Sequence, residues 1–204
     1  MNGRNHALLG GVATFSYLLL SGQDPYRVGL IPFGVGMVIG VASTLLPDID
    51  TPNNHLRSSL GVGSRQTHQA FRSRRRRGLL GRLVDVVRWA IARLLDVVAW
   101  LLPHRGITHW LITAIILTVV LSVICRSQGW WDLVWQTFGV GYLSHLLADV
   151  CTEAGVRLLV PLYLRPLSIP FLRVRTGTWS EQAFVYFLIF LWLVWLSNRY
   201  LGLG

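Results

Sequence analysis

The sequence predicts an all-α membrane protein, with about five membrane-spanning helices and one amphipathic helix at the membrane surface. Of the 204 residues, 52% are hydrophobic and only 14% are charged. The apolar residues stand in long blocks that contain few charges, and the net charge of +10 comes from arginines gathered mainly between the blocks. We expect one membrane-embedded domain over residues 1–204.

The apolar blocks are the predicted spans. They cover residues 7–22, 28–46, 110–125, 132–150 and 183–196. The first block follows a short basic start, as in a secretory signal peptide, but no clear cleavage site of small residues follows it, so we expect a retained helix. In the second block, Gly36 and Gly40 have the small-xxx-small spacing that predicts close helix packing.

The polar and mixed segments between the blocks are predicted to lie at the membrane surface. Residues 55–78 form a basic loop with an arginine run at 74–77, for which anionic lipid is the favoured partner. Residues 79–102 are apolar, yet they carry charges within a stripe of about 140°, which is typical of an interfacial helix. The proline-rich segment 156–178 is expected to be a loop against the membrane surface.

The arginine distribution predicts the orientation of the chain. Sixteen of the 19 arginines fall on the loops of one predicted face and three on the other, so the arginine-rich face should be cytoplasmic. Cys125 and Cys151 fall at opposite faces, about 30 Å apart across the hydrocarbon. A disulfide needs Cα atoms within about 7 Å, so both should be free thiols.

Histidines and aspartates gather at the ends of four predicted spans. Ionisable groups at membrane depth are costly and usually mark a site. The candidates are His6, Asp48, Asp50, His104, His109, His145 and Asp149. In the predicted topology all of them fall on the cytoplasmic face, whereas unrelated helix caps would scatter over both faces. His145 and Asp149 are four residues apart and share one helix face. The sequence therefore predicts one metal site built from four segments.

The same residues predict metal-assisted hydrolysis, because no serine or cysteine nucleophile with a spaced base stands out. A bound metal ion lowers the pKa of water to about 7. Zinc is favoured by the imidazoles, and manganese is the alternative because the site also offers carboxylates. One zinc takes about four ligands, so either two ions bind or some candidates only orient the ligands. Asp50 is the candidate bridge between metals or general base, and Arg105 is the candidate to face the developing negative charge of a phosphoryl group.

Three sequence motifs resemble a known family. Leu-Leu-Pro-Asp-Ile-Asp at 45–50, His-Arg-Gly-Ile-Thr-His at 104–109 and Gly-Tyr-Leu-Ser-His-Leu-Leu-Ala-Asp at 141–149 occur in this order. They resemble the signature motifs of the LexA-regulated, inner-membrane, metal-dependent hydrolase-like proteins of bacteria. His6 occupies the position of that family's early histidine, and Glu153 is no part of its pattern. The resemblance implies a multi-pass protein of the bacterial inner membrane, distantly similar to zinc-dependent phospholipase C.

The expected substrate is a phosphoester in a lipid or lipid-linked molecule, with membrane lipids as partners. The alternative is a non-enzymatic scaffold, regulatory or metal-binding membrane protein that uses the same residues as a vestigial site. A metal carrier is disfavoured, because the predicted spans are nearly bare of polar groups at mid-depth. Nucleic acid is not an expected partner, since the anionic inner leaflet accounts for the arginine run.

Overall fold

The computed structural model describes residues 1–50, 81, 84, 86, 87, 89, 90 and 106–201. The chain forms two compact units, Met1–Pro47 with His109–Gly204, and Asp48–Thr108. In the described residues the regular structure is helical, with isolated β-bridges but no strand. The all-α prediction is confirmed for this part of the chain, and the single domain stays a prediction.

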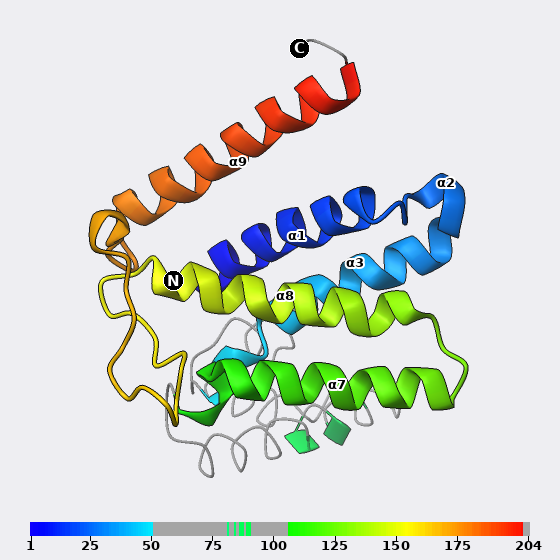
Figure 1. Ribbon diagram of the computed structural model, residues 1–204, viewed down its shortest axis with the longest axis horizontal. Helices are drawn as coiled ribbons and strands as arrows, with labels where there is room; N and C mark the ends of the chain where they lie inside the picture. The colour runs from blue at the N-terminus through cyan, green and yellow to red at the C-terminus, as the bar shows by residue number, and fades with distance from the viewer. Residues whose placement is uncertain (51–80, 82–83, 85, 88, 91–105, 202–204) are drawn as a thin grey trace. The chain divides into compact units, whose positions relative to one another are not determined.

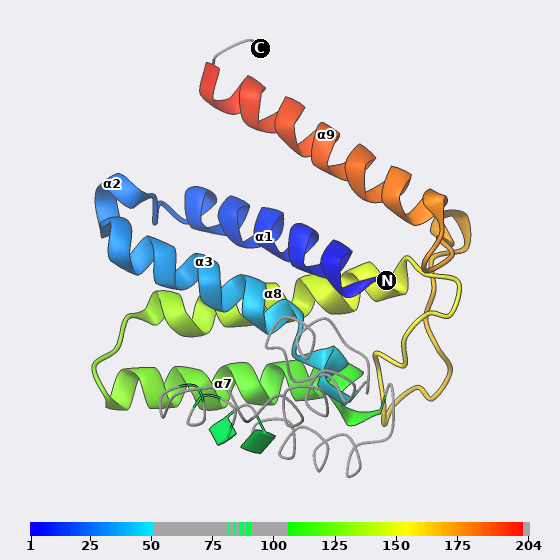
Figure 2. The same ribbon diagram turned by 180° about the vertical axis from the view of Figure 1, so that it is seen from behind.

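The first unit is a bundle of long helices. They are α1 (Gly3–Leu20), α3 (Leu30–Thr44), α7 (Leu111–Ser127), α8 (Asp132–Val150) and α9 (Trp179–Leu201). Helix α8 packs against α1, α3 and α7, and α9 lies beside α1 at the edge of the bundle (Figure 1). The view from behind shows α3 and α7 along the length of α8 (Figure 2). Successive long helices run in alternating directions, so the starts of α1, α7 and α9 and the ends of α3 and α8 lie at one end of the bundle (Figure 1).

Small residues bring α1, α3 and α8 close together. A Cβ atom at Gly141 would overlap the carbonyl oxygen of Gly40, and one at Gly40 would overlap the side chain of Thr14. Gly36 faces Leu133 in the same way. The close packing predicted from the spacing of Gly36 and Gly40 is thus confirmed, and close backbone approach of this kind is typical of helices in membranes.

Several helix boundaries differ from the sequence-based expectations. Helix α1 begins at Gly3, because the side chain of Asn2 caps it by accepting a hydrogen bond from the backbone N–H of Arg4 at 3.3 Å. His6 therefore lies inside the helix and not before it. The expected block 28–46 is divided at Gly29, whose φ of +88° separates α3 from the short helix α2 (Pro25–Val28).

Two further segments differ from the predicted apolar blocks, the one after α3 and the last helix. Residues Pro47–Asp50, directly after the predicted block 28–46, form the 3-10 helix η1. Proline fits the first position of a helical turn because its missing N–H has no partner there. Helix α9 begins at Trp179 and reaches Leu201, and so is longer than the predicted block 183–196.

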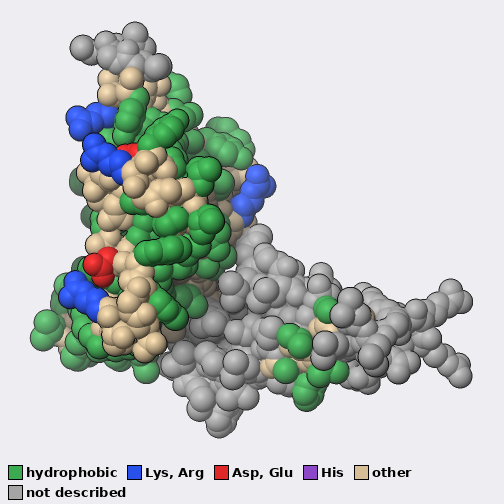
Figure 3. Space-filling model, turned by 90° about the vertical axis from the view of Figure 1, so that its right-hand side faces the viewer, with side chains coloured by type: hydrophobic (Ala, Val, Ile, Leu, Met, Phe, Trp, Pro, Cys, Tyr) green, Lys and Arg blue, Asp and Glu red, His purple; other side chains and the backbone are tan. Residues whose placement is uncertain are grey.

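The membrane-spanning character of the helices differs from one to the next. Among the described residues, Trp179–Tyr200 of α9 has the length and apolar composition of a full span, whereas Leu30–Thr44 and Leu111–Ser127 are apolar but shorter. A full span takes about 20 residues. Figure 3 shows apolar side chains over most of the described face on the side of α2 and the α7–α8 connection. The number of spans predicted from the sequence stays a prediction.

The connection from α8 to α9 is irregular, as the prolines predict. The 3-10 helix η4 (Pro170–Leu172) and two isolated bridges, Thr152 with Val174 and Val156 with Leu167, are its regular features. The predicted basic loop 55–78 lies outside the described residues. Of the predicted interfacial helix 79–102, the six described residues are helical.

Candidate metal centre

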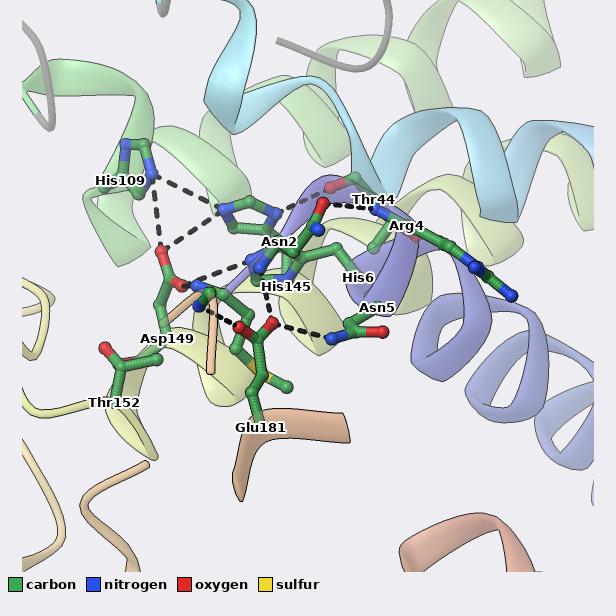
Figure 4. Close-up of polar contacts among 12 residues, drawn as sticks. Asn2, Arg4, Asn5, His6, Thr44, His109, His145, Asp149, Thr152 and Glu181 are labelled. Carbon is green, nitrogen blue, oxygen red and sulfur yellow. Dashed lines mark hydrogen bonds and ion pairs between the residues drawn. The ribbon is translucent and has the colours of Figure 1, made fainter. Parts of the chain in front are cut away.

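Three side chains converge at one end of the first unit. His109 ends the 3-10 helix η3 (Ile107–His109), just before α7 begins. His145 and Asp149 lie one turn apart near the end of α8, on the same helix face. All three side chains are buried, and Figure 4 shows them pointing toward one another. Buried ionisable groups are rare unless they are paired or bind a metal.

The three ligand atoms form a nearly regular triangle. The Nε2 atoms of His109 and His145 are 3.4 Å apart. The Oδ2 atom of Asp149 is 3.4 Å from Nε2 of His145 and 3.6 Å from Nε2 of His109. Tetrahedral zinc, with bonds of about 2.0–2.2 Å, holds neighbouring ligand atoms about 3.3–3.6 Å apart. The triangle therefore has the size of one face of a zinc tetrahedron.

The orientation of His145 is fixed by the backbone of α3. Its Nδ1 lies 2.7 Å from the carbonyl oxygen of Thr44. A carbonyl oxygen only accepts, so in the neutral ring Nδ1 carries the proton and Nε2 keeps its lone pair. That lone pair faces the triangle. Metal-binding histidines commonly donate their other N–H to a carbonyl or carboxylate in this way.

His6 joins the group from α1. Its ring stacks on that of His145, with centroids 3.9 Å apart. Its Nε2 lies 3.2 Å from Oδ1 of Asp149, yet neither ring nitrogen makes a hydrogen bond, although the side chain is fully buried. An unsatisfied buried polar group costs about 1–3 kcal/mol. A cation shared with Asp149 would satisfy the ring, so this imidazole fits a metal centre.

The remaining groups near Asp149 are less suited to bind a metal. The α-amino group of Met1 lies 2.8 Å from Oδ1 of Asp149. Burial, and then the Asp149 carboxylate, raise the pKa of the Cys151 thiol. Because metals bind the thiolate, a thiol with a raised pKa is a poor ligand at neutral pH. Both Cys125 and Cys151 are free, as predicted.

The structure brings four of the predicted ligands together: His6, His109, His145 and Asp149. Asp48 and Asp50 lie in η1, in the second unit. His104 and Arg105 lie outside the described residues. Helix α8 ends at Val150, and Glu153 is exposed beyond it.

Sequence reasoning missed one buried carboxylate near this site. Glu181, in the first turn of α9, accepts hydrogen bonds from the backbone N–H of Asn2 at 2.6 Å, from Nδ2 of Asn5 at 2.7 Å and from the backbone N–H of Gly177 at 2.6 Å. An acidic residue in the first turn of a helix is common, so its sequence position alone gave no signal. A signal was present in the polar Asn2 and Asn5, which flank an apolar block.

Comparison with known proteins identifies the family. The family of YdjM inner membrane proteins matches residues 1–202. The chain belongs to this family. Inner membrane protein YdjM of Escherichia coli (strain K12) is 32% identical over 163 residues, which are 78% of this chain and 64% of that protein. YdjM of Shigella flexneri matches to the same extent.

Family membership confirms the resemblance found in the sequence and supports the inner membrane as the location. The match spans less than two thirds of the length of these relatives. No solved structure matches the chain.

Proposed function

We propose that this protein is a multi-pass inner-membrane hydrolase that binds a divalent metal ion on His109, His145 and Asp149. Its proposed substrate is a phosphoester in a lipid or lipid-linked molecule at the cytoplasmic face. The observation that carries the proposal is the triangle of ligand atoms, with edges of 3.4, 3.4 and 3.6 Å. Two histidines and a carboxylate are also the protein ligands of well-known hydrolytic zinc sites.

Zinc is the ion that the geometry favours. Octahedral magnesium, with bonds of about 2.0–2.1 Å, would hold neighbouring ligands about 2.8–3.0 Å apart, which is shorter than any edge of the triangle. Imidazole ligands also suit zinc better than magnesium. Manganese is the second candidate, because the site includes carboxylates.

One ion would use the three ligand atoms of the triangle, and the chain offers further candidate ligands. Three protein ligands leave a fourth tetrahedral position for water, as in catalytic zinc sites. His6 faces Oδ1 of Asp149, which the α-amino group of Met1 also contacts at 2.8 Å, and His6 is proposed as an additional ligand. Asp48 stands four residues after Thr44 in the chain, and it and His104 are the other proposed ligands.

The proposed reaction is the attack of water on phosphorus. When bound, the metal ion would lower the pKa of water to about 7. The carbonyl oxygen of Thr44 orients the His145 ring so that its Nε2 faces the triangle, where it would bind the ion. Asp50 is the proposed base that takes the proton of the attacking water. The bond from phosphorus to the leaving alcohol oxygen then breaks, and the proton passes to that oxygen. Arg105 would stabilise the developing phosphoryl charge.

The second candidate function is a non-enzymatic membrane scaffold or regulatory protein with a structural metal site. Its supporting observation is the burial of His109, His145 and Asp149, none of them more than 3% exposed. Closed metal sites are generally structural, whereas catalytic sites keep a position open.

Metal content tests the binding part of the proposal. Protein purified in detergent should carry a transition metal, whereas His145→Ala should lose most of it. Glu153→Ala is the control, because it removes an exposed acidic side chain close to the end of the same helix. Elemental analysis measures the result, and equal metal in wild type and His145→Ala would rule out the site.

Turnover separates the enzyme from the scaffold. The assay incubates the protein with phospholipids and lipid-linked phosphates, with and without a chelator. Hydrolysis should require metal, and Asp50→Asn should lower it about 10²–10⁴-fold at unchanged metal content, as expected for a general base. A fully metal-loaded protein without turnover on this panel would favour the scaffold.

A further inference from the structure

We propose that Glu181 of α9 is a positioning residue for the metal centre, acting through His6 of α1. This inference rests on the proposed metal site, but its evidence is a separate set of contacts. Glu181 is buried, with 1% of its surface exposed, and it touches neither the ligand triangle nor Asp149 in any described contact. Any effect of Glu181 on the metal centre must therefore act through the residues that donate hydrogen bonds to it.

The contacts of Glu181 converge on the start of α1. Its Oε1 accepts hydrogen bonds from two groups of that helix end, the backbone N–H of Asn2 and the side-chain amide of Asn5. Its Oε2 accepts from the backbone N–H of Gly177, which holds the carboxylate in place from the α9 side. Both oxygens are thus occupied, and Figure 4 shows the Asn5 side chain turned toward the Glu181 carboxylate.

The first turn of α1 carries these contacts to His6. The backbone N–H groups of Asn5 and His6 both donate to the carbonyl oxygen of Asn2, at 2.9 and 3.1 Å. These bonds join Asn2, Asn5 and His6, and two of these residues, Asn2 and Asn5, also donate hydrogen bonds to Glu181. His6 follows Asn5 directly, so a fixed Asn5 sets the rotation of the helix, and with it the direction of the His6 ring.

The ring of His6 makes no hydrogen bond, and its Nε2 reaches Oδ1 of Asp149 at 3.2 Å only while α1 keeps its position. Stacking on His145 restrains the plane of the ring, but not the rotation of α1. A carboxylate is suited to this position, because a helix N-terminus carries a partial positive charge and unpaired N–H groups. Apolar packing supports the anchor one turn farther along α9, where Val185 is fully buried against Met1 and Ala148.

A purely structural role for Glu181 predicts a different result. In that case its removal would lower the stability of the fold and leave the metal affinity of the folded protein unchanged. A positioning role predicts a loss of metal affinity that depends on His6. Partners that orient metal ligands typically contribute about 10–100-fold in affinity.

The test measures zinc affinity, by competition with a chromogenic chelator, on detergent-purified folded protein. Glu181→Ala should weaken zinc binding about 10–100-fold. Glu181→Gln should give a smaller loss than Glu181→Ala, because its amide oxygen can still accept from both Asn2 and Asn5, although its NH₂ group would face the N–H of Gly177. Asn5→Ala should give an intermediate loss. Glu153→Ala, at an exposed glutamate between α8 and α9, should have no effect.

The decisive comparison repeats Glu181→Ala in a His6→Ala background. If Glu181 acts through His6, the second substitution adds no further loss of affinity. An unchanged affinity in folded Glu181→Ala, or an equal loss with and without His6, would overturn the inference. If Glu181→Ala does not fold, Asn5→Ala in the two backgrounds decides by the same criteria. A wild-type protein without zinc affinity would instead overturn the metal site itself.

Discussion

Asp149 is the residue on which the imidazoles of the site depend. Its Oδ2 faces His109 and His145, and its Oδ1 faces His6. One carboxylate therefore contacts three imidazole rings, although it is almost fully buried. A buried carboxylate is unfavourable without cations or hydrogen bonds around it. The α-amino group of Met1 supplies one cation, 2.8 Å from Oδ1, and a metal ion on the Oδ2 side would supply positive charge next to His109 and His145.

Asp149→Asn should release the metal ion. The amide keeps the shape of the side chain but removes its charge, and its NH₂ group would face an imidazole nitrogen. We expect zinc affinity to fall at least 10–100-fold, because even residues that only orient ligands contribute that much. Asp132→Asn is the matched control, since Asp132 begins the same helix but is exposed. Chelator competition measures both, and a folded Asp149→Asn variant with wild-type affinity would refute the assignment.

The grouping of His109, His145 and Asp149 could be predicted from the sequence because its signal is local. His145 and Asp149 are four residues apart on a long helix, and each histidine stands at the end of an apolar block. The role of Glu181 could not be predicted in this way. Its partner side chain, Asn5, is 176 residues away, and two of its three bonds go to backbone N–H groups, which have no sequence signature.

At the scale of helices, the apolar blocks predicted correctly which segments form the long helices of the bundle. They predicted the first and last residues of these helices less accurately. The predicted block 132–150 coincides with α8, because Trp130 and Trp131 precede it and a turn follows it. Helix α9 was predicted too short, since its first turn contains the polar Ser180 and Glu181. Burial of Glu181 against α1 compensates for that polarity, and such tertiary contacts are invisible in a hydropathy pattern.

The packing of α8 on α3 should depend on Gly141. An alanine Cβ there would overlap the carbonyl oxygen of Gly40, so the two helices would have to separate. We expect Gly141→Ala to destabilise the protein by about 1–3 kcal/mol, the usual cost of overpacking. Metal retention should fall as well, because α8 carries His145 and Asp149. Thermal unfolding in detergent and elemental analysis measure the two effects.

Gly34→Ala is the control for this substitution. A Cβ at Gly34, also within a helix of the bundle, would have no neighbour within 4 Å. Alanine is the better helix former by up to about 1 kcal/mol. Stability and metal content should therefore stay the same or rise slightly. An equal loss of stability in both variants would show that the approach of the two backbones at Gly141 is not the cause.

Over the whole first unit, the two ends of the bundle differ in chemistry. The end with the proposed metal ligands continues into the α8–α9 connection, whose Arg157, Arg165, Arg173 and Arg175 are exposed. The other end has the exposed Trp130 and Trp131 at the α7–α8 connection. Tryptophans favour the membrane–water interface, and arginines favour the cytoplasmic side. These features support the proposed orientation, in which the proposed metal centre faces the cytoplasm.

Cysteine labelling tests this orientation with one exposed position at each end. Thr176→Cys lies in the arginine-rich connection, and Ser127→Cys lies at the end of α7. Cys125 and Cys151 are first replaced by serine, so that each protein carries one thiol. In intact cells an impermeant thiol reagent should label Ser127→Cys, and it should label Thr176→Cys only after the membrane is opened. The reverse pattern would place the metal centre outside the cytoplasm. A phosphoester substrate would then have to come from the outer leaflet of that membrane, since the ligands, all at one end of the bundle, would face away from the cytoplasmic pool.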